Sequence, residues 1–398
     1  MTWLWRNGVD TLADQGWERS RWEWRIEDGG DPSRLVEEFL AEHGLPVRNL
    51  AVGSGSVADG ARRRGVLGAS LYVSAAAAVV SIGAPPGRPS PAPALPDAVA
   101  VVWSQPASAP IEQAVHSART SFRWELDSWR PSWSPEQHAE AVTRARESIS
   151  RGELYQVNLV GHASAAYRGD PRPALRRVTT LPGARYAGSL GGDGWALACA
   201  SPETLVATGG GRVWTGPIKG TRPADEVGRR ELLASTKERA EHVMIVDLAR
   251  NDLSQVARTG TVRVDDLYAV RRWCDLWQAE SVVSAALADG VGLAELLRAV
   301  CPGGSVTGAP KRAALALINE LEPVGRGASM GAFGWVGLDG LDLGLTIRTV
   351  AADPDRLHLW AGGGITWGSD PQAEVAEAAA KAAPLRRVLA EAEATTRR

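Results

Sequence analysis

The stretch "ASMGAFGWVGLDGLDLGLTIRTVAAD", residues 328–353, decides between the architectures open to this chain. Glycines interrupt its apolar runs, and "LDG" lies between two of these runs as a turn. This pattern is typical of a β-hairpin, whose strands pair antiparallel. A sheet built only from parallel βαβ units is therefore excluded, and we predict a mixed α/β fold of the α+β type.

The sequence around this hairpin alternates between further strands and helices. "SPEQHAEAVTRARESISRGEL", residues 134–154, predicts a helix that Ser134 caps and Gly152 ends. "LYQVNLVGHASA", "AVAVVWS" and "RVWTGPI" predict strands, and "RLHLWAGGGI" predicts a strand that runs into a glycine turn. "GLAELLRAV", "KRAALALINELEP", one long stretch over residues 228–257, and a closing segment with a kink or break at Pro384 predict helices.

Two segments of the N-terminal third need separate interpretation. Residues 65–83 carry no charge and approach the length of a membrane span. Their Gly, Ser and Ala content instead favours two short buried strands with a turn between them. The Pro-rich residues 84–97 predict an exposed connection.

The amino-acid composition restricts which binding partners and which cellular compartment we expect for the protein. The chain has 398 residues, of which 44% are hydrophobic and 23% charged, and a formal net charge of −2. This balance gives no indication of a nucleic-acid or membrane-surface partner. The three cysteines are scattered and form neither a disulfide framework nor a zinc motif, which favours a reducing cytoplasm. The first ~110 residues carry few chemical signals.

The stretch "TGPIKGTRPADE", residues 215–226, places Lys219 between an isoleucine and a glycine, bracketed by two prolines. A lysine held on a stiff loop with little polar company can have a lowered pKa and act as a nucleophile. The alternative is a solvated loop lysine, which is the commoner case.

Two pairs of glutamates have helical spacing. Glu238 and Glu241 are three residues apart on one predicted helix, and Glu374 and Glu377 on another. Each pair shares a helical face, and two such faces brought together need a cation. Oxygen ligands without histidine or cysteine favour Mg²⁺. Solvated helix faces are the alternative.

Several further residues have the chemistry to contact an anionic substrate. "CPGGSVTGAPK" and "AGGGIT" are glycine-rich turns whose backbone amides can face an anion, although the first is not a P-loop. The stretch "TIRTV" predicts an apolar strand that contains Arg348, whose guanidinium there needs either a substrate carboxylate or a structural ion pair. Glu203 follows the apolar strand "GWALACA", where burial would raise its pKa and suit it to act as a general acid.

From about Ser134 to the C-terminus, the chain resembles the chorismate-utilising enzymes. The resemblance rests on "GELYQVNL", "SPETL", "PIKGTRP", "KERAEHVMIVDLARNDL", "CPGGSVTGAPK", "TIRT", "AGGGI" and "DPQAEVAEAAAK", in the order the family has them. It implies two packed, mainly antiparallel β-sheets flanked by helices. It also implies a chorismate-binding catalytic region over residues 130–398, with residues 1–115 as a divergent N-terminal part of one compact unit.

Within the family, two positions resemble the aminodeoxychorismate synthases, which aminate chorismate at carbon 4. Their "PIKGT" carries a lysine, here Lys219, proposed to attack ring carbon 2 before ammonia enters at carbon 4. Anthranilate synthases carry alanine there, and isochorismate and salicylate synthases carry a lysine base where this chain has Gln156. Amination at carbon 2, and a catalytically silent relative that only binds a partner, are the alternatives.

The resemblance also assigns roles by position. It implies Lys219 and Glu203 as catalytic residues, with Glu203 protonating the leaving hydroxyl, and a Mg²⁺ site in which Glu241 and Glu377 bind directly and Glu238 and Glu374 through water. The implied substrate contacts are Thr307, Arg348, Gly363, Gly364 and Lys381.

The chain departs from its relatives in a few places. Ser329 and Met330 replace an aromatic position, Ala378 replaces the usual threonine, and Gln278 stands where some relatives have histidine. A Leu-Glu-Ser-type tryptophan-binding motif is not found near the N-terminus. No glutaminase nucleophile elbow surrounds any cysteine, so we expect ammonia to come from a separate glutamine amidotransferase subunit, or as free ammonia in vitro.

Overall fold

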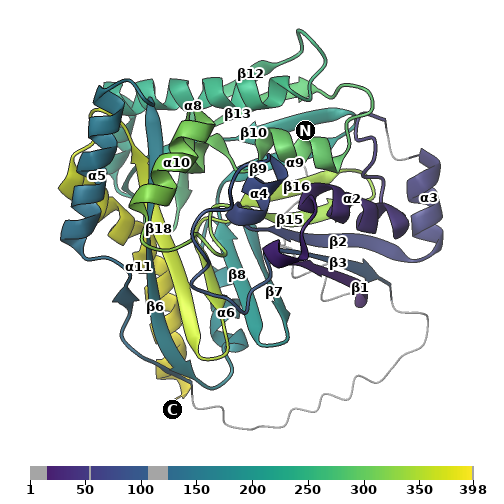
Figure 1. Cartoon of the computed structure of the whole chain (residues 1–398), viewed down its shortest axis with the longest axis horizontal. Helices are drawn as coiled ribbons and strands as arrows, with labels where there is room; N and C mark the ends of the chain where they lie inside the picture. The colour runs from purple at the N-terminus through teal and green to yellow at the C-terminus, as the bar shows by residue number, and fades with distance from the viewer. Residues whose placement is uncertain (1–15, 53–54, 106–123, 397–398) are drawn as a thin grey trace.

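The computed structural model describes residues 16–52, 55–105 and 124–396. Within these ranges the chain forms a mixed α/β fold with two β-sheets, and every pair of neighbouring strands is antiparallel (Figure 1). The predicted fold class is confirmed.

The larger sheet has ten strands in the described part of the chain and is built around the predicted hairpin. Its order is β1-β3-β2-β15-β16-β9-β10-β13-β11, and β12 pairs with β13. Trp335 of β15 lies opposite Asp342 of β16 on one side and Ser70 of β2 on the other. The N-terminal strands therefore continue the same sheet as the hairpin. The strands are β1 (Trp17–Trp24), β2 (Val66–Val73), β3 (Ala98–Ser104), β9 (Thr204–Gly209), β10 (Arg212–Gly216), β11 (Ile218–Pro223), β12 (Arg263–Trp273), β13 (Leu276–Ala286), β15 (Ala332–Gly337) and β16 (Leu341–Leu345).

The smaller sheet has the order β14-β6-β18-β17-β8-β7, with the short strands β4 and β5 also paired to β6. Its long central pair is β6 (Gln156–Arg168) and β18 (Arg356–Ile365), which pair without a register shift from Val157 opposite Ile365 to Ala166 opposite Arg356. The remaining strands are β4 (Glu125–Leu126), β5 (Arg130–Pro131), β7 (Tyr186–Gly192), β8 (Trp195–Ser201), β14 (Gly308–Ala309) and β17 (Thr349–Ala352).

Two of the connections between the sheets, which we call the crossings, carry residues of the candidate active site. The chain leaves the smaller sheet after β8 and enters the larger at β9, and it returns between β16 and β17. The two crossings are hydrogen-bonded to each other, because the Leu345 amide donates to the Glu203 carbonyl and the Ala200 amide donates to the Arg348 carbonyl. Glu203 and Arg348 are thereby held side by side, far apart as they are in sequence.

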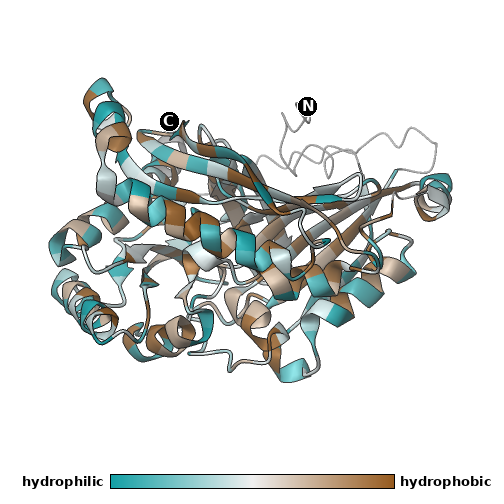
Figure 2. Ribbon diagram, turned by 90° about the horizontal axis from the view of Figure 1, so that it is seen from above, coloured by the Kyte–Doolittle hydropathy of each residue, from teal (hydrophilic) through white to brown (hydrophobic). Residues whose placement is uncertain are grey.

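Helices cover the sheets and bury their apolar faces. Along most helices hydrophobic and hydrophilic residues alternate, as Figure 2 shows. α8 packs on β11 and β13, while α11 packs on β18, α5 and α6. The helices are α2 (Pro32–Glu42), α3 (Gly55–Arg63), α4 (Ala75–Ser81), α5 (Pro135–Ser150), α6 (Arg172–Thr179), α7 (Glu226–Ala234), α8 (Thr236–Ser254), α9 (Leu293–Val300), α10 (Lys311–Leu321) and α11 (Pro371–Thr396), with short 3-10 helices η1 (Ile26–Asp28) and η2 (Gly304–Val306).

Several predicted elements are confirmed, and local signals in the sequence explain why they form. α5 begins after Ser134, whose hydroxyl accepts from the Gln137 amide while the Gln137 side chain accepts from the Ser134 amide. The predicted strands around residues 98–104 and 156–166 are present, as are the helices α9 and α10. α11 continues through Pro384 without ending there.

Two predicted elements are wrong in part. Residues 65–83 form one strand, β2, and then the helix α4, because the Ser74 hydroxyl accepts from the Ala77 amide and caps an alanine-rich run. The long helical stretch over residues 228–257 is two helices, because Ser235 ends α7 and its hydroxyl then caps α8 at Glu238.

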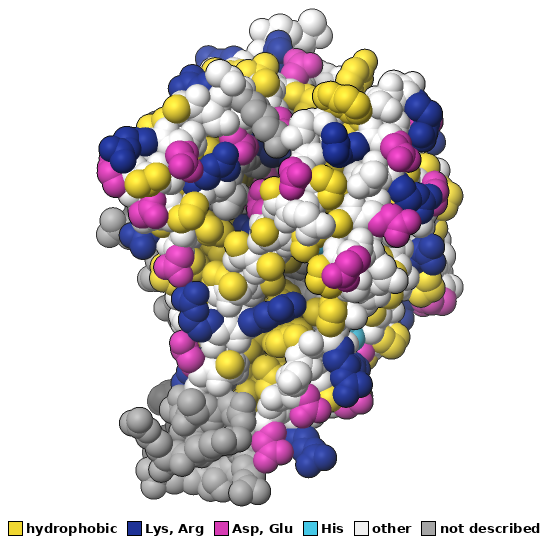
Figure 3. Space-filling view, turned by 90° about the vertical axis from the view of Figure 1, so that its left-hand side faces the viewer, with side chains coloured by type: hydrophobic (Ala, Val, Ile, Leu, Met, Phe, Trp, Pro, Cys, Tyr) yellow, Lys and Arg dark blue, Asp and Glu magenta, His cyan; other side chains and the backbone are white. Residues whose placement is uncertain are grey.

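The surface gives no sign of a one-sided charge field on the face that Figure 3 shows. Lys and Arg side chains lie among Asp and Glu side chains across that face, in keeping with the small net charge. Within the described residues, none of the helices combines the length and apolar character needed to cross a membrane. The division of the chain between residues 115 and 130 stays a prediction, and residues 106–123 lie outside the described residues.

Candidate active site

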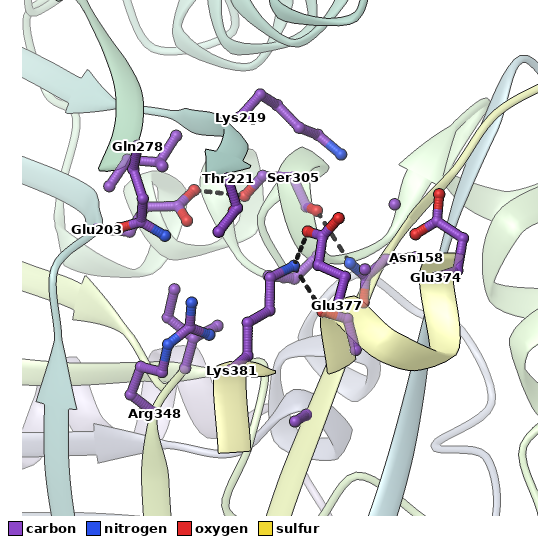
Figure 4. Close-up of a pocket in the computed structure, with 18 of the residues that line it drawn as sticks. Asn158, Glu203, Lys219, Thr221, Gln278, Ser305, Arg348, Glu374, Glu377 and Lys381 are labelled. Carbon is purple, nitrogen blue, oxygen red and sulfur yellow. Dashed lines mark hydrogen bonds and ion pairs between the residues drawn. The ribbon is translucent and has the colours of Figure 1, made fainter. Parts of the chain in front are cut away.

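A pocket opens where the two crossings, β11, β18, α8 and α11 meet (Figure 4). All the predicted catalytic, metal-binding and substrate-binding residues line it except Thr307. Glu203 and Lys381, which are 178 positions apart in sequence, thus face one cavity.

Lys219 lies on β11, opposite Ala279 of β13, and not on the predicted loop. Its Nζ reaches β18 so closely that a Cβ added at Gly364 would be 2.0 Å from it. Burial is the main cause that lowers the pKa of Lys219, and the charge of Lys381 acts in the same direction. The carboxylates of Glu241, Glu377 and Glu374 oppose this shift.

Glu203 is buried at the crossing from β8 to β9, with 5% of its surface exposed. The Ser305 hydroxyl donates to its Oε1 at 2.7 Å. Burial raises the pKa of Glu203 from its ordinary 4.5 to about 7, although the Ser305 hydrogen bond and the charges of Lys219 and Arg348 oppose the shift. A carboxyl of this kind carries a proton near neutral pH, as a general acid requires.

Arg348 precedes β17 at the second crossing, with a backbone φ of 55°, so it does not lie within a strand as predicted. Its guanidinium carbon lies 4.7 Å from the centre of the Trp273 ring. Its Nε is buried and has no hydrogen-bond partner among the described residues. Burial lowers the pKa of Arg348 to about 10, opposed first by Glu377 and then by Glu203. The group is placed to receive an anion from the pocket.

The two predicted acids of α8 each have a polar partner. Glu238 Oε1 lies 3.0 Å from Nη1 of Arg222. Glu241 Oε1 accepts a hydrogen bond of 2.8 Å from the Thr366 hydroxyl, at the end of β18. These contacts orient both carboxylates at the edge of the pocket.

The two acids of α11 lie across the pocket. Glu374 Oε1 accepts a hydrogen bond of 2.6 Å from the Ser369 hydroxyl. Glu377 Oε1 lies 2.6 Å from Lys381 Nζ, one helical turn on, and Lys381 also donates to the Gly362 carbonyl at 2.9 Å. A Cβ at Gly363 would lie 3.0 Å from Glu374 Oε2, so glycine leaves the acids room against β18.

The four acids form an all-oxygen donor set of the type that suits Mg²⁺. Their hydroxyl partners on Thr366 and Ser369 are the outer contacts that hold ligand carboxylates in orientation. In the described part of the chain, no three candidate ligand side chains converge on one point closely enough to hold an ion. The chemistry of the four acids suits the metal, but the acids are not gathered around one point, so the metal site and its direct ligands stay a prediction.

The three consecutive glycines do not form the predicted turn. Gly362, Gly363 and Gly364 belong to β18 and pair with β6. A Cβ at Gly362 would lie 1.9 Å from the Leu159 carbonyl oxygen, and a Cβ at Gly364 would meet Lys219. Glycine serves here for close approach on both faces of a strand.

Thr307 is the one predicted contact that the structure places elsewhere. It is buried, and its hydroxyl donates to the Gly303 carbonyl at 2.8 Å. Ser305, two residues earlier in the same glycine-rich stretch, lines the pocket in its place, together with Asn158. The spacing of the stretch could not separate these two hydroxyls, because η2 turns the chain between them.

Some of the residues that differ from those of the family line the pocket, and others are buried outside its lining. Met330 and Gln278 line the pocket. Ser329 is buried behind it and donates to the Thr346 carbonyl. Gln156 is fully buried, and neither polar atom of its amide has a hydrogen-bond partner among the described residues. Its Nε2 lies 3.4 Å from where a Cβ of Gly364 would be, close to the Lys219 amine.

Comparison with known proteins places the chain in a family. Residues 95–387 match the family of chorismate binding enzymes. Anthranilate synthase component 1 of Streptomyces coelicolor A3(2) is 41% identical over 275 residues, which cover 67% of this chain and 54% of the relative. Aminodeoxychorismate synthase component 1 of Klebsiella aerogenes is 39% identical over 256 residues, which cover 63% and 57%.

A solved structure is similar over nearly the whole chain. Anthranilate synthase component I of Streptococcus pneumoniae TIGR4 superposes with a TM-score of 0.73 at 25% identity, covering 92% of this chain and 90% of that one. The chain spans about half the length of the curated relatives it matches. Anthranilate synthases and aminodeoxychorismate synthases have similar sequence identity to this chain, so identity does not decide between these two members of the family. The chain belongs to the chorismate binding enzyme family.

Proposed function

We propose that this protein aminates chorismate at carbon 4 to give 4-amino-4-deoxychorismate, through a covalent intermediate on Lys219. The single observation that carries the proposal is the pair of residues Lys219 and Glu203, which line one pocket and whose pKa values shift toward each other. Burial favours the neutral amine on one and the protonated carboxyl on the other, which are the forms of a nucleophile and a general acid.

The reaction can be written with balanced bonds. The neutral Lys219 nitrogen bonds to ring carbon 2, the ring double bonds shift, and the bond from carbon 4 to its hydroxyl breaks. Glu203 gives its proton to that hydroxyl, which leaves as water, and the adduct nitrogen becomes a secondary ammonium. Ammonia then bonds to carbon 4, the double bonds shift back, and Lys219 leaves as a neutral amine. One difficult displacement is thereby split into two.

The other pocket residues suit a substrate with two carboxylates. Arg348 offers a buried guanidinium whose Nε has no hydrogen-bond partner among the described residues, and Lys381 of α11 offers a second cation in the same pocket. Glu238, Glu241, Glu374 and Glu377 would hold Mg²⁺, which when bound offsets the negative charge of a substrate carboxylate. Gly363 and Gly364 let the substrate ring approach the backbone of β18.

Ammonia has to be supplied to this pocket. The sequence contains no glutaminase motif, and relatives are named as component 1 of their synthases. We therefore propose that a separate glutamine amidotransferase subunit supplies ammonia in the cell, and that ammonium salts replace it in vitro.

Amination at carbon 2 is the competing function, because relatives named anthranilate synthase are as similar as those named aminodeoxychorismate synthase. After incubation of the chain with chorismate, Mg²⁺ and ammonium, anthranilate is distinguished from 4-amino-4-deoxychorismate by mass and absorbance, and the 2-amino isomer, which has the same mass, by chromatography and NMR. The proposal expects 4-amino-4-deoxychorismate from the wild-type protein and a loss of most of it in Lys219→Ala. Anthranilate or 2-amino product from the wild type would replace the proposal with its competitor.

A further inference from the structure

The short helix η2 presents a serine to the proposed general acid. The Ser305 hydroxyl donates to Glu203 Oε1 at 2.7 Å. The last torsion of a glutamate side chain has a broad, shallow energy profile, so a carboxyl without such donors rotates readily. The hydrogen bond from Ser305 therefore restricts the rotation of the Glu203 carboxyl.

A buried ion pair holds the backbone that carries this serine. Arg326 and Glu322 lie 2.7 Å apart, with only 8% and 4% of their side chains exposed. Arg326 also donates to the carbonyl of Val306, next to Ser305, and to the carbonyl of Asn158 on β6 at 2.8 Å. Glycines 303 and 304 precede Ser305, so side-chain packing within the segment does little to fix it, and the guanidinium fork supplies the constraint.

We propose that Ser305 is a positioning residue for the general acid: its hydroxyl fixes the rotation of the Glu203 carboxyl, and the buried Arg326–Glu322 pair holds Ser305 in place. This inference rests on the proposed function, in which Glu203 protonates the leaving hydroxyl. It adds a residue beyond the proposed nucleophile, general acid and metal-binding acids, in the short helix η2 at the pocket wall.

The direction of the effect follows from the groups that face Glu203. These are the Ser305 hydroxyl, the Ile218 amide, Lys219 and Arg348, all of which favour the ionised carboxylate. Removing one donor raises the pH at which the carboxyl loses its proton, since a hydrogen bond to a charged group stabilises the charged form. Its loss also frees the carboxyl to rotate, which lowers the rate even where the group is protonated.

The test is the pH dependence of kcat in Ser305→Ala with chorismate, Mg²⁺ and saturating ammonium. Because Lys219 must be neutral and Glu203 protonated, the profile has a maximum, and we expect kcat at that maximum to fall about tenfold to a hundredfold. We also expect the basic limb, on which activity is lost, to move up by about one pH unit. Ser305→Thr keeps a hydroxyl and should restore the wild-type basic limb. Arg326→Lys keeps the charge beside Glu322 but loses the fork, and should lower kcat more than it changes KM.

Controls separate this inference from the function on which it rests. Ser148 is buried in α5, where its hydroxyl accepts from Arg151 outside the pocket, so Ser148→Ala should leave the profile unchanged. If Glu203→Gln abolishes amination while folded Ser305→Ala keeps the wild-type kcat and basic limb, the positioning role is refuted and the function stands. If Glu203→Gln retains amination, the general-acid assignment itself fails.

Discussion

Gly364→Ala is a small change that should disable the reaction without disturbing the fold. The backbone at Gly364 is ordinary extended strand, paired with Asn158 of β6, which alanine adopts readily. The added Cβ would lie 2.0 Å from Lys219 Nζ, whereas its other near neighbours, in the Gln156 amide, are at 3.4 and 3.5 Å. An ordinary contact needs at least 3.4 Å, so the amine has to move by about 1.4 Å.

That displacement sets the expected magnitude. A misplacement of about 1 Å at a reacting group can cost about 10²-fold in rate, so we expect kcat for 4-amination to fall by at least that factor. Only the flexible end of a lysine has to yield, and alanine reduces the entropy of the unfolded chain, so the free energy of unfolding should change by less than about 1 kcal/mol. Chorismate and ammonium kinetics, with thermal unfolding of the same samples, measure both quantities.

Two comparisons make the result decisive. In a Lys219→Ala background, Gly364→Ala should have no further effect on rate, because the group it displaces is gone. Gly362→Ala, two residues earlier, would place its Cβ 1.9 Å from the Leu159 carbonyl oxygen, a backbone atom that cannot yield, and should destabilise the fold. A folded Gly364→Ala protein with wild-type kcat would refute the placement of the Lys219 amine against β18.

Three further outcomes are expected. Because burial raises the pKa of Glu203 to about 7, amination should fall as pH rises through about 7. The folded state keeps the Glu203 proton up to about pH 7 whereas the unfolded state releases it near pH 4.5, so the free energy of unfolding should also fall between these two pH values. Urea titrations at pH 5, 6, 7 and 8 should show this fall in the wild type and a flatter dependence in Glu203→Gln. Glu241→Gln should lower activity by orders of magnitude and weaken its Mg²⁺ dependence, and unchanged turnover across a Mg²⁺ titration would remove the metal assignment. The purified chain should use ammonium but not glutamine, and equal rates with both would contradict a separate glutaminase subunit.

Local signals in the sequence were enough to predict many of the elements. The cap at Ser134 and the "LDG" turn each act over a few residues, so the helix α5 and the β15–β16 hairpin could be predicted without knowing the fold. The wrong boundaries also have local causes that pattern alone underweights. Ser74 and Ser235 are both caps, and each starts a helix where a continuous pattern suggested otherwise.

The errors within the site come from contacts between distant segments. The three glycines of β18 look like a turn in sequence, and only the approach of Leu159 and Lys219 to the strand explains why glycine is needed in an extended conformation. Arg348 and Glu203 were predicted singly, but their shared environment depends on two crossings between sheets that no local pattern encodes. Ser305 was missed for the same reason, because its significance lies in its contact with Glu203, 102 positions earlier.

The central claim is that Lys219 becomes bonded to the substrate ring during turnover, and mass analysis of the trapped protein tests it most directly. The wild-type protein is incubated with chorismate and Mg²⁺ without ammonia, quenched, and digested, with Lys219→Ala treated in parallel. The account predicts an adduct of chorismate less one water on the wild-type peptide that contains Lys219, and none on the variant. Full 4-amination by Lys219→Ala, with no adduct on the wild-type protein, would contradict it.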